Sequence, residues 1–159
     1  MTGFDSIQVR FKNTPEILSP FANTRVVPFV NSYFDVIKSV IEDVRTEYFW
    51  LFASFINLET FNFIDYIPEQ HEKDQMHVWY TTHPMGGLNK EGNVFLIPTK
   101  KFKEQMDEIK FLRDFKDINY HPDPDLYQRP LTKVAFDLRD PLKTYRSDKQ
   151  LYKWLINKD

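Results

Sequence analysis

The sequence of 159 residues contains no cysteine. This absence excludes disulfide bonds, thiolate catalysis and metal sites with cysteine ligands, and it suits the reducing cytosol. The chain also lacks an apolar run of about 20 residues, the length that a membrane-spanning helix needs. Its first residues, MTGFDSIQVR, show neither the basic start nor the apolar core of a signal peptide. We therefore expect a soluble, cytoplasmic protein that makes no contact with a membrane.

The chain also has no large net charge of either sign. The 21 lysine and arginine residues face 23 aspartate and glutamate residues, for a net charge of −2. A basic patch is the electrostatic footprint of nucleic-acid binding. We therefore expect no nucleic-acid partner.

Glycine is scarce, with 4 residues in the chain, and Gly86, Gly87 and Gly92 account for all but one of them. The segment 86–92 contains neither G-x-x-x-x-G-K-[ST] nor G-x-G-x-x-G, so it does not predict a phosphate cradle. We interpret it as a hairpin loop in which glycines adopt positive φ angles, longer than the usual hairpin connection.

The chain is instead rich in rings, with 15 Phe, 8 Tyr and 3 Trp making up 16% of the residues. An aromatic side chain buries a large area with few rotatable bonds, so the core is expected to consist mainly of rings. The length fits one globular domain, and we assign residues 1–159 to a single domain.

The clearest pattern in the sequence is a helix followed by an apolar strand. Ser32 can cap a helix, and Asp35 follows three residues later as the acidic partner of a capping box. The strand, Tyr48 to Phe55 (YFWLFASF), is typical of one that is covered on both faces. The helix is predicted to continue through Val44, because apolar residues recur at intervals of three and four: Phe34, Ile37, Val40, Ile41 and Val44.

Alternation within residues 4–12, with Ile7, Val9 and Phe11 between Gln8, Arg10 and Lys12, predicts a half-exposed strand at a sheet edge. The aromatic residues after the apolar strand are expected to fold back onto the core, together with one isoleucine: Phe61, Phe63, Tyr66 and Ile67. The remaining predicted elements are a short strand at 25–27, a surface loop at 68–75, strands at 76–82, 93–97, 117–121 and 133–138, and helices at 99–113 and 147–157, capped by Thr99 and Ser147. This order indicates an α/β (or α+β) fold with a mixed β-sheet and about three helices packed on its faces.

Two further patterns resemble metal sites and are interpreted otherwise. His71, His77 and His83 follow one another at intervals of six, which provides no local pair such as H-x-x-x-H for zinc. Asp123 and Asp125 form an Asp-x-Asp pair, which can hold Mg²⁺ or Mn²⁺, but they lie between prolines, as is typical of a turn. We therefore predict that the chain binds no metal and no cofactor.

Short aromatic segments carry a resemblance to a known fold: residues 46–50 (TEYFW), 61–63 (FNF) and 76–79 (MHVW). With the preceding helix, they resemble GT-A-type glycosyltransferases, and more narrowly a glycosyltransferase-like (GT-A-like) module of poorly characterised phage and marine-virus proteins. The resemblance implies a layered α/β fold and, in an active enzyme, an acidic Asp-x-Asp pair after the strand. This sequence has Ser54 and Asn57 in that region (SFIN), so the resemblance implies the scaffold alone.

Two functions follow from these patterns. The first is a non-catalytic binding or accessory module of phage type, with a protein or small-molecule partner and with self-association into a homo-oligomer left open. The alternative is a glycosyltransferase-like enzyme, or a fragment of one, that acts on a nucleotide-sugar. Either would work in the cytoplasm, including that of a host cell.

A ligand site is expected just past the carboxyl end of the apolar strand, where ligands bind in open α/β sheets. Ser54, Asn57 and Glu59 are the polar residues that the chain delivers to that edge. His83, beside the predicted hairpin loop, is the contributor that we expect from outside the strand.

Overall fold

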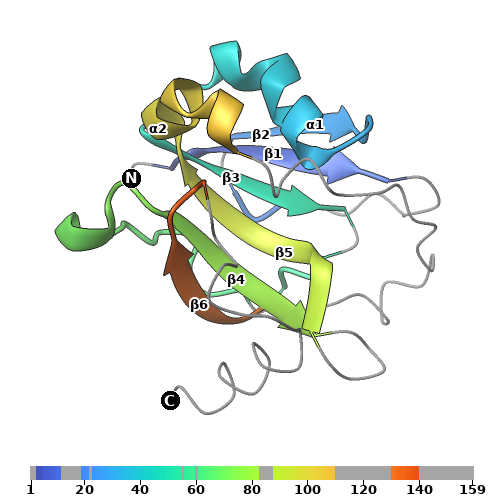
Figure 1. Cartoon of the computed structure of the whole chain (residues 1–159). Coiled ribbons are helices and arrows are strands. Elements are labelled where there is room, and N and C mark those ends of the chain that lie inside the picture. Colours follow the sequence, from blue (N-terminus) through green and yellow to red (C-terminus); the bar gives the residue numbers. More distant parts are fainter. Residues whose placement is uncertain are drawn as a thin grey trace.

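The computed structural model describes residues 3–11, 19–21, 23–54, 56–59, 61–82, 88–109 and 130–139, with the backbone alone at 80–82, 88–93 and 130–134. These parts form a mixed sheet, with α1 and α2 along one face (Figure 1). The predicted α/β or α+β class is confirmed. Two α-helices and three short 3₁₀ helices in the described residues agree roughly with the expected number of helices. None of these helices is long and apolar enough to cross a membrane.

The sheet has six strands in the order β2-β1-β3-β5-β4-β6. One half is parallel, because β1 pairs in the same direction with β2 and with β3. The other half is antiparallel, through β3–β5, β4–β5 and β4–β6. The strands are β1 (Asp5–Arg10), β2 (Asn23–Pro28), β3 (Tyr48–Ala53), β4 (Met76–Thr82), β5 (Leu88–Pro98) and β6 (Pro130–Phe136).

The apolar strand β3 lies in the middle of the sheet, and all six of its residues are buried. Phe49 points to the helix face, where its ring lies 5.9 Å from that of Phe102. Trp50 points to the other face and stacks on Phe21 at 4.7 Å. The prediction of a strand covered on both faces is confirmed.

Strand β1 corrects the prediction of a half-exposed edge strand at 4–12. It lies between β2 and β3, and the polar residues Ser6 and Gln8 are buried, at 2% and 5% exposure. The alternation arises because polar side chains on the non-helix face are hydrogen-bonded inside the protein; the Ser6 hydroxyl donates to the carbonyl oxygen of Asn23 at 2.9 Å. Among the described strands, β2 and β6 form the edges.

Helix α1 (Tyr33–Val40) begins as predicted. The Ser32 hydroxyl accepts a hydrogen bond from the backbone N–H of Asp35 at 3.1 Å, which satisfies one of the free donors of the first turn. The helix is shorter than predicted and continues as the 3₁₀ helix η1 (Ile41–Asp43). The apolar spacing persists across this change, because residues three apart share a face in both helix types.

Helix α2 (Thr99–Glu104) is also shorter than the predicted 99–113, and the 3₁₀ helix η3 (Met106–Glu108) follows it. The prediction of Thr99 as the cap is wrong. Pro98 occupies the cap position, and the Thr99 hydroxyl donates instead to the carbonyl oxygen of Thr46 at 2.9 Å. The local pattern predicted that the Thr99 hydroxyl caps the helix, but this hydroxyl bonds to a carbonyl oxygen that is distant in the chain.

The predicted strands at 76–82 and 93–97 are confirmed as β4 and as part of β5, which pair antiparallel. Because β5 begins at Leu88, the predicted loop is wrong from Leu88 onward, and Gly92 lies within a strand. The strand at 133–138 is present as β6, which starts earlier and ends at Phe136. The predicted short strand at 25–27 is present as part of β2. Three predictions lie outside the described residues: the strand at 117–121, the turn at Asp123 and Asp125, and the helix at 147–157.

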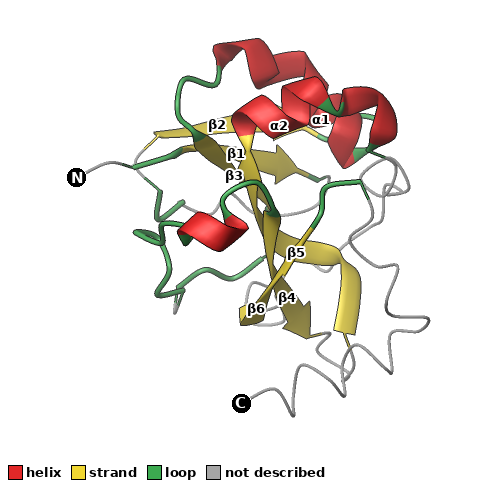
Figure 2. Cartoon of the chain, turned by 60° about the vertical axis from the view of Figure 1, so that its left-hand side comes forward, coloured by secondary structure: helices red, strands yellow, loops and turns green. Residues whose placement is uncertain are grey.

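The sheet face opposite α1 and α2 is covered by residues 61–75, here called the cover segment, which contains the 3₁₀ helix η2 (Gln70–Glu72) (Figure 2). Phe61 and Tyr66 fold back onto the core as predicted, with their rings 5.5 Å and 5.4 Å from Trp79. Ile67 is 64% exposed, so its predicted packing is wrong.

The far end of the cover segment is attached by hydrogen bonds to sheet residues. The Tyr48 hydroxyl donates to the carbonyl oxygen of Lys73 at 2.6 Å. Burial, with the nearby carboxylates of Glu47 and Asp74, raises the pKa of Tyr48 to about 12. His77, which is fully buried, places Nε2 3.1 Å from the carbonyl oxygen of Glu72. Since a carbonyl only accepts, Nε2 carries the proton.

Candidate functional site

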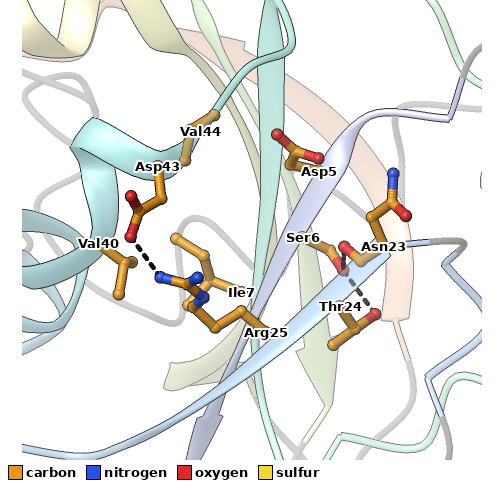
Figure 3. A pocket seen from close by; sticks show the side chains of 9 residues that line it. All are labelled: Asp5, Ser6, Ile7, Asn23, Thr24, Arg25, Val40, Asp43 and Val44. Carbon is orange, nitrogen blue, oxygen red and sulfur yellow. Dashed lines mark hydrogen bonds and ion pairs between the residues drawn. The ribbon is translucent and has the colours of Figure 1, made fainter.

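A pocket of about 280 Å³ lies where the first residues of β1 and β2 meet the end of α1 and η1 (Figure 3). It is at the amino end of the parallel strands, opposite to the end where the sequence predicts a ligand. The residues that line it are Asp5, Ser6, Ile7, Asn23, Thr24, Arg25, Val40, Asp43 and Val44.

The strand register explains why charged and apolar side chains meet there. Asp5 pairs with Asn23 and Ile7 pairs with Arg25 across β1 and β2, so these four residues share the helix face. The end of η1 brings Asp43 to the same place, where its carboxylate forms an ion pair with Arg25. Both side chains are more than half exposed, at 54% and 59%, so this pair contributes at most about 1 kcal/mol to stability.

Asp5 is held by the connection between η1 and β3. Its carboxylate Oδ2 accepts from the backbone N–H of Arg45 at 2.7 Å, and its own N–H donates to the Thr46 hydroxyl at 2.9 Å. The second carboxylate oxygen, Oδ1, has no hydrogen-bond partner in the described part of the chain. The same holds for Oδ1 of Asp43 and for the side-chain amide of Asn23. These groups are therefore available to a ligand.

The hydroxyls of Ser6 and Thr24 have a structural task. Alternation along the strands places them on the face away from Asp5 and Arg25. Their oxygens lie 2.7 Å apart, and the Thr24 hydroxyl also donates to that of Ser19 at 2.7 Å. This chain of hydroxyls joins β1 to β2 side by side and so fixes the register that forms the pocket.

The pocket combines an apolar part with an excess of negative charge. Ile7, Val40 and Val44 supply the apolar side chains. Among the described residues that line it, Asp5 and Asp43 carry two negative charges against the single positive charge of Arg25. A pocket slightly below the usual range of about 300–1,000 Å³, with this charge, can hold a small molecule that carries one positive charge and a short apolar body.

Three of the residues predicted to bind a ligand, Ser54, Asn57 and Glu59, lie elsewhere. Ser54 is buried at 3% exposure, and its hydroxyl accepts from the backbone N–H of Phe11 at 3.1 Å. The side-chain oxygen of Asn57 accepts from the N–H of Glu59 at 2.9 Å, which is the geometry of an Asx turn. The structure thus brings Asn57 and Glu59 together in one turn. His83 lies outside the described residues, so a shared site of all four stays a prediction.

The histidine series spreads over different environments. His71 is exposed, with Nδ1 3.4 Å from a carboxylate oxygen of Glu69 and Nε2 3.3 Å from one of Glu72. His77 is buried, and its Nδ1 lies 3.5 Å from the Tyr66 hydroxyl. In the described ranges, no group of three or more histidine, aspartate or glutamate residues is placed to hold a metal ion.

Sequence reasoning missed the residues of the pocket, namely Asp5, Asn23, Arg25 and Asp43. Their order in the chain gives no motif, and they meet only through the pairing of β1 with β2 and the position of η1. The sequence contains only a weak signal for this pocket, namely charged residues at the start of a strand and at the end of a helix.

No protein-family model, no curated protein and no solved structure matches this chain. The resemblance to GT-A-like modules therefore stays a prediction from the aromatic segments.

Proposed function

We propose that the chain is a non-catalytic binding module that holds a small ammonium compound in the pocket between β1, β2 and η1. The observation that carries this proposal is the excess of carboxylate over guanidinium around the pocket, with Asp5 and Asp43 against Arg25. A ligand with one positive charge makes the occupied pocket neutral.

The available atoms fit the two ends of such a ligand. The ammonium group donates to the free Oδ1 of Asp5, a charge-assisted hydrogen bond of the stronger kind. The short carbon body lies against Val40 and Val44, where it leaves water. The side-chain amide of Asn23 provides both a donor and an acceptor for a further polar group.

Binding without catalysis is supported by the residues past the end of β3. The GT-A resemblance expects an acidic pair in this region, and the chain has Ser54 and Asn57 there. The Ser54 hydroxyl accepts from the N–H of Phe11, and Asn57 stabilises its own turn. The proposal includes a cytoplasmic location, supported by the absence of cysteine.

A thermal-shift panel tests this proposal against the glycosyltransferase-like alternative. The panel contains isobutylammonium, its neutral counterpart isobutanol, and a nucleotide-sugar with and without Mn²⁺. A ligand at a hundred times its Kd adds about 2.7 kcal/mol of stability. We expect stabilisation by isobutylammonium and none by isobutanol. If the nucleotide-sugar stabilises the protein only when Mn²⁺ is also present, the result would favour the glycosyltransferase-like enzyme.

Two variants locate the ammonium site. Asp5→Asn keeps an oxygen acceptor for the N–H of Arg45 but removes the negative charge, and it should abolish the shift. Glu42→Gln is the matched control, since Glu42 is an exposed acid in η1 that does not line the pocket. An equal effect of both substitutions would refute binding in the pocket.

A further inference from the structure

Strand β2 has an open edge in the part of the chain that the structure describes. It pairs with β1 on one side, and no described strand lies on its outer side, the side away from β1 (Figure 1). A strand edge of this kind presents N–H and C=O groups that can pair with another chain. The outer edge of β2 is therefore a candidate interaction surface.

The hydrogen bonds at the end of β2 show which of its backbone groups point outward. Phe29, the residue directly after the strand, donates its N–H to the carbonyl oxygen of Arg10 in β1 at 3.0 Å. Backbone groups alternate in direction along a strand, so those of Thr24, Val26 and Pro28 point away from β1. Pro28 agrees with this direction, because proline within a sheet lies on an edge strand with its nitrogen facing outward.

The side chains along this edge leave room for a neighbouring strand. Val26, in the middle of the strand, is 46% exposed, and β-branched apolar side chains are typical of paired strands. The charge of Arg25 is already balanced by its ion pair with Asp43. Pro28 limits pairing only at the end of the strand, because it lacks an N–H to donate.

We propose that two copies of this chain pair through the outer edges of β2, antiparallel and with a two-fold axis at Val26. Each Val26 then exchanges both of its backbone hydrogen bonds with Val26 of the second copy. The N–H of Thr24 donates to the carbonyl oxygen of Pro28 across the axis, and the symmetry repeats this bond. The two six-stranded sheets become one continuous sheet, and the two Val26 side chains meet on the face away from the helices.

The chemistry of β2 favours this register over its neighbours. An axis at Arg25 would place the two arginines directly opposite each other, and like charges in that position are destabilising. An axis at Val27 would place Val26 opposite Pro28, which has no N–H for the carbonyl oxygen of Val26. With the axis at Val26, Arg25 lies opposite the apolar Val27, and both backbone groups of Val26 are paired.

A second copy fits this edge because the edge is complementary to itself. A two-fold axis joins the same surface of both copies and closes both edges at once, so association stops at the dimer. The contact is small, and small interfaces are typical of weak complexes; we therefore expect the dimer to dissociate on dilution. Pairing uses the backbone of β2, so it does not rest on ammonium binding by the side chains that line the pocket.

Disulfide cross-linking tests the axis directly, because the chain has no cysteine of its own. The Cα atoms of a hydrogen-bonded antiparallel pair are about 5.5 Å apart, within the range of about 4.4–6.8 Å that a disulfide bridges. Val26→Cys should therefore give a covalent dimer under mild oxidation. Val30→Cys is the matched control: Val30 is similarly exposed, at 54%, but lies beyond the end of β2 and away from the axis, so this variant should stay monomeric.

Sedimentation equilibrium of the unmodified protein measures the association itself. We expect the mass to rise with concentration from that of one chain to that of two. Val26→Pro removes an N–H that points away from β1 and so leaves the pairing of β1 with β2 intact; it should weaken the dimer at least about tenfold. Val26→Ala keeps the N–H and should weaken it less. Circular dichroism verifies that each variant is folded, and the Val26→Cys cross-link tests the axis even where Val26→Pro fails to fold.

The proposal fails on any of three results. The first is a mass of one chain at every concentration, which would leave the edge to an extended peptide of another protein. The second is equal cross-linking of Val26→Cys and Val30→Cys, which would mean random collision or a contact elsewhere. The third is a dimer that a folded Val26→Pro variant does not weaken, since that dimer would not use the edge of β2.

Discussion

Thr99 and Thr46, which are 53 residues apart in the chain, are joined by a hydrogen bond of 2.9 Å from the hydroxyl of the first to the carbonyl oxygen of the second. A second bond runs beside it, from the N–H of Thr99 to the carbonyl oxygen of Glu47 at 2.9 Å. Together they fix the start of α2 against the turn that leads into β3. The hydroxyl and the backbone N–H of one residue thus hold the start of a helix on the sheet.

We predict that Thr99→Val lowers the free energy of unfolding by about 1 kcal/mol, because it keeps the shape of the side chain but removes the donor to Thr46. Thr99→Ser retains the hydroxyl and should cost less. Urea denaturation of the two variants measures the difference. Equal losses would mean that the methyl group of Thr99, and not its hydrogen bond, stabilises this contact.

Phe52 in β3 is 1% exposed, and its ring lies 5.5 Å from that of Phe21. We predict that Phe52→Ala costs about 3–5 kcal/mol of unfolding free energy, the usual range for removing a buried ring. Val26→Ala in the edge strand β2 is the control, since Val26 is 46% exposed and surface changes cost about 0.5 kcal/mol or less. A loss below about 1 kcal/mol in Phe52→Ala would contradict a doubly covered β3.

Ser54→Ala should cost about 1–3 kcal/mol, because the buried N–H of Phe11 then loses its acceptor. Glu59→Gln, an exposed position in the neighbouring turn, should be nearly neutral. Thermal or urea unfolding measures both. A neutral Ser54→Ala would show that the hydroxyl is not required by the fold, and it would restore Ser54 as a ligand-binding candidate.

The carboxyl group of Asp137, the residue directly after β6, is expected to titrate at unusually low pH. The carboxylate of Asp137 accepts from Nε and Nη2 of Arg139, each at 2.9 Å, and this side-chain hydrogen bonding lowers the pKa of Asp137 from 3.8 to about 2. Because the folded pKa lies below the unfolded one, the contribution to stability is present above about pH 4 and disappears as the pH falls toward 2.

The carboxyl carbon of Asp137, followed by NMR from pH 1 to 6, measures this value. Arg139→Ala should return the midpoint toward 3.8, the value without the hydrogen bonds. A midpoint near 3.8 in the unmodified protein would mean that the pair does not persist in solution.

The helix start and the central strand could be predicted because their signals are local. Ser32 and Asp35 stand in the capping spacing, and the residues of β3 are all apolar. Both patterns depend only on residues that are close together in the chain, and each is compatible with few other local structures. The length of α1 was not predictable in this way, because the apolar spacing does not distinguish an α-helix from a 3₁₀ continuation.

The environment of β1 and the pocket could not be predicted, because both depend on pairing between distant segments. Alternation at Ser6 and Gln8 has the same appearance whether the polar face meets water or the hydroxyl of another strand. Asp5 and Asp43 converge only after β2 aligns with β1 and α1 ends at Val40. Register, helix length and strand order all have to be known before such a site is visible.

The place of β1 in the sheet has a consequence for the newly made chain. β1 leaves the ribosome before its neighbours on either side, β2 and β3, and the second neighbour is complete only at Ala53. At about 5–20 residues per second, both of its edges stay open for seconds, with Ile7 and Val9 exposed between them. Unpaired strand edges are templates for pairing with other chains. During synthesis, the aggregation hazard of this protein therefore lies in its first strand.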